Sequence, residues 1–106
     1  MEQAQTKAFA VYQSHMNSEL TSTNVRKVVA EAKNGHVRFL FVPQGAEQWG
    51  SVIPPDTVHV HAQRETGDDE LLNLAAVWTI RSGGRVFAVA PGKLPEGAAV
   101  AATFRF

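Results

Sequence analysis

Residues 24–42 read NVRKVVAEAKNGHVRFLFV, and this stretch predicts a helix followed directly by a strand. Its first apolar residues recur at helical spacing; they are Val25, Val28, Val29 and Ala32. The polar run before them supplies N-cap candidates, and Asn34-Gly35 is a typical helix stop because glycine tolerates the left-handed conformation. We therefore expect a helix over residues 24–34.

The strand that follows, residues 36–42, is largely apolar on both faces. One face carries Val37, Phe39 and Phe41, and the other carries Arg38, Leu40 and Val42. A strand with two apolar faces must be covered on both sides, which is typical of a central position in a sheet.

Ahead of this pair, residues 3–16 carry a second helical stripe, formed by Ala4, Ala8, Val11, Tyr12 and His15. The apolar run inside the stripe is also short enough to be a strand over residues 7–13. The content of alanine, glutamine and lysine favours the helix.

The C-terminal part shows strand patterns separated by turns. Residues 43–56 carry two glycines and three prolines without periodicity, so we expect a long loop there. Residues 57–63 alternate apolar and polar side chains, which predicts a half-buried strand. Further strands are predicted over residues 74–81, 85–90 and 99–106, with a hairpin turn at Ser82-Gly83-Gly84 between the first two.

These elements predict an α+β fold in a single domain, residues 1–106. We expect two N-terminal helices packed on one face of a mostly antiparallel sheet of about five strands. The other face would be solvated or would meet a second copy of the chain.

Composition excludes several chemistries. The 106 residues include no cysteine, which excludes disulfides, zinc–thiolate sites, iron–sulfur clusters and thiol catalysis. No apolar stretch reaches the roughly 20 residues of a membrane helix, and the N-terminus lacks the features of a secretion signal, so we expect a cytoplasmic protein. The sequence contains no phosphate loop and no Gly-x-Ser-x-Gly element, so a non-enzymatic protein without a cofactor is favoured.

The formal charge is zero, but it is unevenly distributed. Residues 1–40 carry a net charge of +2, residues 41–80 carry −5 and residues 81–106 carry +3. The two ends could combine into a basic patch that binds nucleic acid, made of Arg26, Lys27, Arg38, Arg81 and Arg85. The alternative is a solvated surface of mixed sign, which the neutral balance favours.

His59 and His61 are the best candidates for a metal site. They lie two residues apart on a predicted strand, so both imidazoles point to the same side and can chelate a divalent metal if a third ligand comes from elsewhere. The acidic cluster Asp68-Asp69-Glu70 is one source of that ligand. The alternative is a solvated strand face whose polar residues are histidines, beside a turn in which acidic residues are ordinary.

Trp49 and Gln48 lie in the predicted loop and are candidates for partner binding, because tryptophan is enriched in binding hot spots. The alternative is that Trp49 folds back over the edge of the core. Arg105 and Phe106 are further candidates, because a last strand at the edge of the sheet offers a template for pairing with a second copy. The alternative there is an internal strand that is paired on both sides.

Three functional hypotheses follow. The first is a small non-enzymatic module, of regulator or inhibitor type, that binds a larger protein partner and can form a homodimer. The second is a divalent-metal-binding protein or metalloenzyme built on His59 and His61. The third is a nucleic-acid-binding module that uses the basic patch.

Overall fold

A mixed four-stranded sheet forms the centre of the molecule. The computed structural model describes residues 2–16, 18–55 and 57–105. The strands lie in the order β1 (Thr21–Ser22), β7 (Ala101–Phe104), β2 (Val37–Pro43) and β6 (Arg85–Val89). Strand β2 pairs antiparallel with β7 and parallel with β6, so its predicted central position is confirmed.

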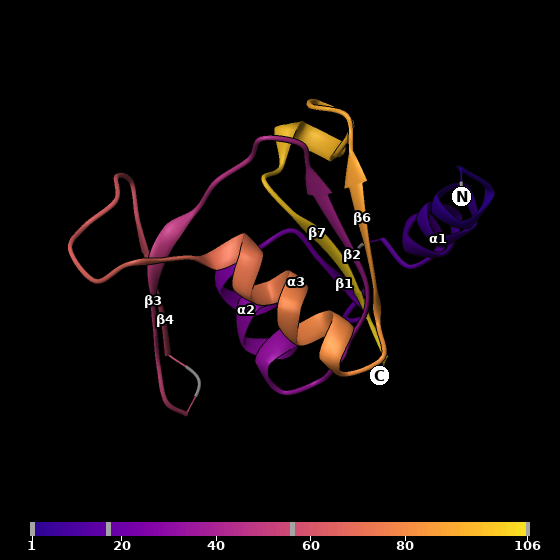
Figure 1. Cartoon of the computed structure of the whole chain (residues 1–106). Helices are drawn as coiled ribbons and strands as arrows, with labels where there is room; N and C mark the ends of the chain where they lie inside the picture. Colours follow the sequence, from indigo (N-terminus) through magenta and orange to yellow (C-terminus); the bar gives the residue numbers. More distant parts are fainter. Residues whose placement is uncertain (1, 17, 56, 106) are drawn as a thin grey trace.

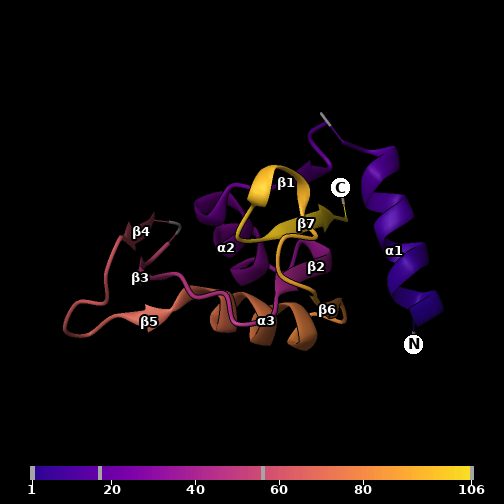
Figure 2. The ribbon, with the colours of Figure 1, turned by 90° about the horizontal axis from the view of Figure 1, so that it is seen from above.

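Helices cover both faces of this sheet. Helix α1 (Glu2–Ser14) packs on one face, and α2 (Val25–Lys33) and α3 (Leu71–Arg81) pack on the other (Figure 2). The α+β class and both N-terminal helices are confirmed. The expectation that these two helices share one face is wrong, because β2 is apolar on both sides and each side requires its own cover.

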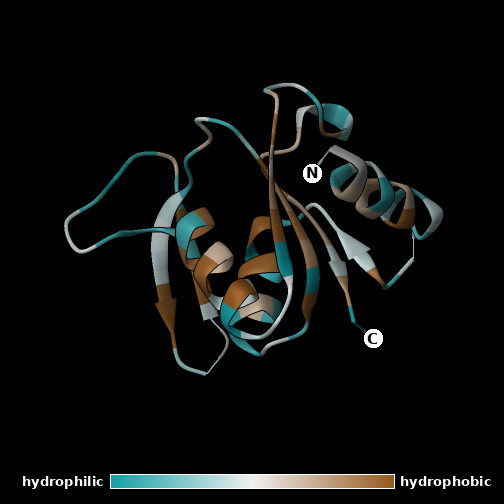
Figure 3. Ribbon diagram, turned by 45° about the vertical axis from the view of Figure 1, so that its right-hand side comes forward, coloured by the Kyte–Doolittle hydropathy of each residue, from teal (hydrophilic) through white to brown (hydrophobic). Residues whose placement is uncertain are grey.

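Two separate apolar clusters result from this layering. Figure 3 shows hydrophobic residues along the central strands and on the helices that cover them. Val28, Val29 and Leu40 are fully buried between the sheet and the helices α2 and α3. On the other face, Phe9 and Tyr12 of α1 lie against Phe41 of β2, with ring centroids 5.4 and 5.9 Å apart. These aromatic contacts attach α1 to the sheet.

Residues 74–81, predicted as a strand, belong to helix α3. The apolar run fits a buried helix as well as a strand, and the cap residues decide between them. The Glu70 side chain accepts hydrogen bonds from the N–H groups of Leu72 and Asn73 at the start of the helix. After the end of the helix, Gly83 adopts the left-handed conformation, with φ of 88°. Strand β6 therefore follows a helix, and it pairs parallel with β2 instead of returning in a hairpin.

The predicted loop 43–56 contains a strand, and it begins a projecting substructure. Strands β3 (Trp49–Ile53), β4 (Thr57–His61) and β5 (Asp69–Glu70) form a second, antiparallel sheet in the order β4-β3-β5. We call residues 44–70 the arm, because they extend to one side of the body (Figure 1). The predicted strand 57–63 is confirmed over its first five residues.

The short 3-10 helix η1 (Pro95–Gly97) joins β6 to β7. Strand β7 lies between β1 and β2, so the prediction of a sheet edge at the C-terminal strand is wrong. The alternative of an internal, doubly paired strand is correct, because the short strand β1 covers the side that would otherwise be open. No helix among the described residues is long and apolar enough to cross a membrane.

Candidate functional site

The two faces of the arm have different environments. Residues that pair directly across β3 and β4 share a face, so Val52, Val58 and Val60 point together toward the body. All three pack against the cluster formed by α2, α3 and the main sheet. This inner face attaches the arm to the body.

Gly50 permits the close approach of the arm strands to the body. A Cβ atom at Gly50 would lie 1.9 Å from the backbone oxygen of His59 and 2.9 Å from Leu71 Cδ1. The backbone of β3 therefore lies against β4 and α3 at a distance that only glycine allows.

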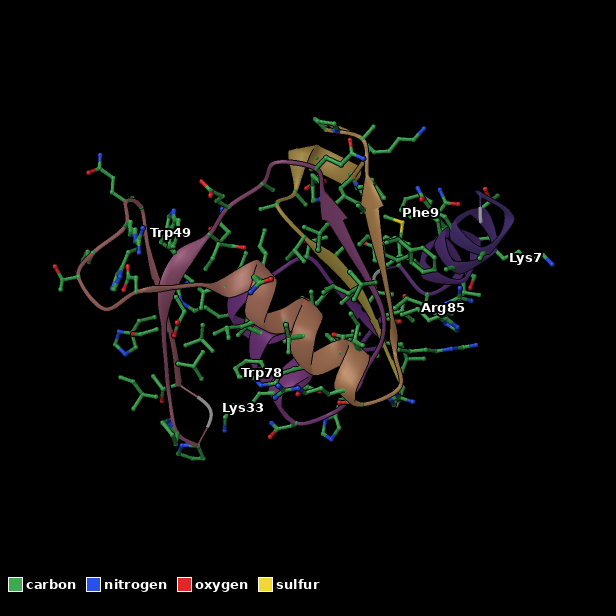
Figure 4. The ribbon with its side chains drawn as sticks, in the orientation of Figure 1. Lys7, Phe9, Lys33, Trp49, Trp78 and Arg85 are labelled. Carbon is green, nitrogen blue, oxygen red and sulfur yellow. The ribbon has the colours of Figure 1, made fainter. Side chains whose placement is uncertain are left out.

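The opposite side of the arm, which we call the outer face, mixes aromatic, polar and apolar groups. It consists of Trp49, Ser51 and Ile53 on β3 and Thr57, His59 and His61 on β4. Every one of these residues is exposed or half-exposed, and Ile53 retains 49% of its accessible surface. Figure 4 shows Trp49 at the base of the arm, away from the central sheet.

The Trp49 ring is held by a cation. The guanidinium carbon of Arg64, from the loop between β4 and β5, lies 4.7 Å from the ring centroid of Trp49. Trp49 is half-buried, so part of its ring remains accessible. The ring is both ordered by its neighbour and accessible from outside.

Gln48 joins the arm to helix α3 through its backbone N–H and carbonyl groups. Its N–H donates to Glu70 Oε2 at 2.8 Å, and its carbonyl accepts from the N–H of Leu71 at 2.7 Å. These two bonds join the start of β3 to the start of α3. The residue therefore anchors the base of the outer face.

His59 and His61 lie on the same side of β4, as predicted. The Nδ1 atom of His61 lies 2.8 Å from Asp68 Oδ2, and this hydrogen bond raises the pKa of the imidazole and lowers the pKa of the Asp68 carboxyl. Within residues 2–16, 18–55 and 57–105, no group of three or more potential ligands has the geometry of a metal site. His61 instead contacts the carboxylate of Asp68. The same carboxylate accepts a hydrogen bond from the N–H of Glu65 and so closes the loop between β4 and β5.

The predicted basic patch is divided between two faces. Arg26 and Lys27 lie on α2, whereas Arg38 and Arg85 lie in strands β2 and β6 and line one groove beside α1. Arg81 is exposed in the last turn of α3. Lys7 of α1 lines the same groove as Arg38 and Arg85, and the sequence analysis missed it because sequence separation hides the docking of α1 on the sheet.

Arg105 is used within the chain. Its guanidinium donates to the carbonyls of Gly35 and Ser82, at 3.2 and 2.6 Å, beyond the ends of α2 and α3. Cations at helix C-termini satisfy carbonyls that have no partner inside the helix. Phe106, its predicted companion in partner binding, lies outside the described residues.

Comparison with known proteins finds a similar fold but no matching sequence. No family model matches this sequence, and no curated protein matches it. Among solved structures, the C-terminal domain of a peptide chain release factor from Methanosarcina mazei is similar, with a TM-score of 0.71 and 12% sequence identity. The match covers 98% of this chain and 82% of that one, so the two share a fold over nearly the whole chain.

Proposed function

We propose that this chain is a non-catalytic, cytoplasmic interaction module that docks onto a larger macromolecular assembly through the outer face of the arm. The observation that carries the proposal is Trp49, a half-exposed ring that Arg64 holds in place on a projecting sheet. Tryptophan and arginine are the residue types most enriched in interface hot spots. A ring that is ordered before binding loses little conformational entropy when a partner covers it.

The remainder of the outer face supports the same role. Ile53 places an exposed apolar side chain at the far end of β3, and polar residues lie between it and Trp49. An apolar anchor surrounded by polar groups is the usual composition of a protein interface. The tip of the arm is fixed to the body, since Lys33 Nζ donates to the carbonyl of Pro55 at 2.8 Å.

The shared fold suggests which assembly to test first. The similar solved structure belongs to a peptide chain release factor, a protein of translation. We therefore propose the ribosome as the partner assembly. The identity of 12% carries no residue correspondence, so the proposal that the arm makes the contact depends on the exposed side chains of this chain alone.

Co-sedimentation with ribosomes from the organism that encodes the chain tests this function. Wild-type protein is expected to pellet with ribosomes, and Trp49→Ala and Ile53→Ser to weaken binding at least about tenfold each, the range of interface hot spots. Ile80→Ser is the matched control, because Ile80 is 62% exposed on α3 and lies outside the arm. Absence of wild-type protein from the pellet, or an equal loss with the Ile80 variant, would contradict the proposal. Circular dichroism of each variant checks that the fold is retained.

A further inference from the structure

A groove with a cationic lining lies between α1 and the main sheet, on the side of β6. It has a volume of about 480 Å³. Lys7 of α1, Arg38 and Phe39 of β2, and Arg85 of β6 line it together with small apolar residues of α1. Figure 4 shows Lys7 and Arg85 on the same side of the molecule, away from the arm.

An irregularity in β2 brings Arg38 to the groove. The pairing of β2 with β7 shifts register between Val37 and Phe39, so Val37 and Leu40 both reach the cluster under α2 and α3. Strict alternation would place Arg38 on the side opposite Phe39, yet both line the groove. A bulge of this kind re-aims a side chain, and here it places an arginine beside an aromatic ring.

The cationic groups in the groove have no carboxylate partner among the described side chains. Among the side chains that the structure describes, every ion pair within 4.0 Å involves a histidine, so Lys7, Arg38 and Arg85 have no carboxylate at that distance. Six of the ten acidic residues fall between positions 47 and 70, in the arm. The body outside that segment carries nine basic residues and four acidic residues. The groove therefore lies in the positive part of a chain whose total charge is zero.

Aromatic rings accompany the two arginines. The guanidinium carbon of Arg38 lies 4.8 Å from the ring centroid of Phe39, and that of Arg85 lies 5.6 Å from the ring centroid of Phe87. Phe39 and Phe87 are both half-buried, with centroids 6.2 Å apart. Planar cations over neighbouring rings form a surface on which flat groups can stack.

We propose that this groove binds single-stranded RNA. Phosphates would contact Lys7 and the two arginines, and one or two bases would stack on the guanidinium and phenyl planes. An acidic peptide would match the charge but would leave the stacking planes unused. A duplex buries its base faces and cannot stack on the groove.

The groove is separate from the outer face of the arm. The preference of the groove for single strands is argued from its cations and aromatic rings. Only the choice of RNA over DNA rests on the proposed ribosomal function. Stacking and phosphate contacts read no 2′-hydroxyl, so RNA and DNA of the same length are expected to bind with similar affinity. Binding by the free oligonucleotide is measured without ribosomes, so the two proposals can fail independently.

Fluorescence anisotropy of a labelled 12-nucleotide single-stranded RNA with the full chain tests the proposal. With three phosphate contacts, raising monovalent salt from about 50 to about 200 mM is expected to weaken binding roughly 20-fold, since each contact contributes about 0.7 to the logarithmic slope. The double variant Arg38→Gln/Arg85→Gln is expected to show only about a threefold change over the same range. Its affinity at low salt should also fall below that of wild type.

The matched control is Arg26→Gln/Lys27→Gln, which removes the same charge from α2 on the opposite side of the sheet. It should retain the wild-type salt dependence. An equal loss with this variant, or no binding at about 50 mM salt, would overturn the proposal. So would equal affinity for a hairpin duplex or for a polyglutamate peptide of the same charge, because either result removes the role of stacked bases. Trp49→Ala should bind the RNA as wild type does.

Discussion

The Nδ1 atom of His61 lies 2.8 Å from Oδ2 of Asp68 and closes the loop between β4 and β5. The Asp68 side chain is only 4% exposed, whereas that of His61 is 26% exposed. Each partner favours the charged form of the other, so the pKa of His61 is raised by the hydrogen bond to Asp68 and the pKa of Asp68 is lowered by the bond to His61.

This pair predicts a pH-dependent loop. A raised pKa in the folded state means that the stabilisation from His61 is complete below its unfolded pKa, near 6.5, and is lost as pH rises through the higher folded pKa. The contribution of Asp68 is present above its unfolded pKa, near 3.9, and is lost as pH falls through the lower folded pKa. Amide exchange of residues 62–68 should therefore be slowest between about pH 4 and 6.5, after correction for intrinsic rates.

The Asp68→Asn variant provides the control. An NMR titration should show a lower pKa for His61 in this variant than in wild type, because the charged partner is gone. An unchanged His61 pKa would show that the contact between His61 Nδ1 and Asp68 Oδ2, at 2.8 Å, does not stabilise the charged imidazole.

Glu70 connects the arm to helix α3 by hydrogen bonds, so we expect its removal to destabilise the fold. Its carboxylate accepts from the N–H groups of Gln48, Leu72 and Asn73 at 2.8, 3.1 and 2.9 Å. Glu70→Ala should lower the free energy of unfolding by about 1–3 kcal/mol, because a helix cap is lost and the N–H of Gln48 is left without its acceptor. Urea denaturation measures the change, and Asp69→Ala, on the exposed neighbour, should stay within about 0.5 kcal/mol of wild type.

Gly50 lies where β3 has no room for a larger side chain, so we expect substitution there to destabilise the fold. Gly50→Ala would place a methyl group into the backbone oxygen of His59, so β3 must move away from β4 or α3. We expect a loss of about 1–3 kcal/mol in thermal or urea denaturation, the usual cost of overpacking. Ser51→Ala, whose side chain lies on the outer face, should change stability by less than about 0.5 kcal/mol. Equal stability of the two variants would be inconsistent with the close packing described above.

Thr79 predicts a stabilising substitution. Its Oγ1 atom is buried and has no hydrogen-bond partner among the residues that the structure describes, and Thr79 is 1% exposed. Thr79→Val keeps the shape and removes the unsatisfied hydroxyl, so the free energy of unfolding should rise by about 1 kcal/mol. Differential scanning calorimetry should show a higher Tm, whereas Thr57→Val, at an exposed position of β4, should leave it nearly unchanged. A lower Tm for the Thr79 variant would indicate a partner for the hydroxyl.

The sequence by itself determined the elements whose signals are local. The helix at 25–33 and the strand at 37–43 follow from apolar periodicity, a polar run with N-cap candidates and the Asn34-Gly35 stop, all within about 20 residues of one another. The two apolar faces of β2 also predicted its central position. The alternation in β4 correctly placed His59 and His61 on one side, because side-chain direction in a strand depends only on the count of residues.

Only the tertiary structure decided how these elements pack and which distant residues come together. The run 71–81 is apolar enough for a strand or a helix, and Glu70 selects the helix through hydrogen bonds to Leu72, Asn73 and the distant Gln48. The groove residues Lys7, Arg38 and Arg85 come together because α1 docks on Phe41 and a bulge turns Arg38 toward it. Such contacts join positions up to 78 residues apart, and their energy depends on packing that no local pattern contains.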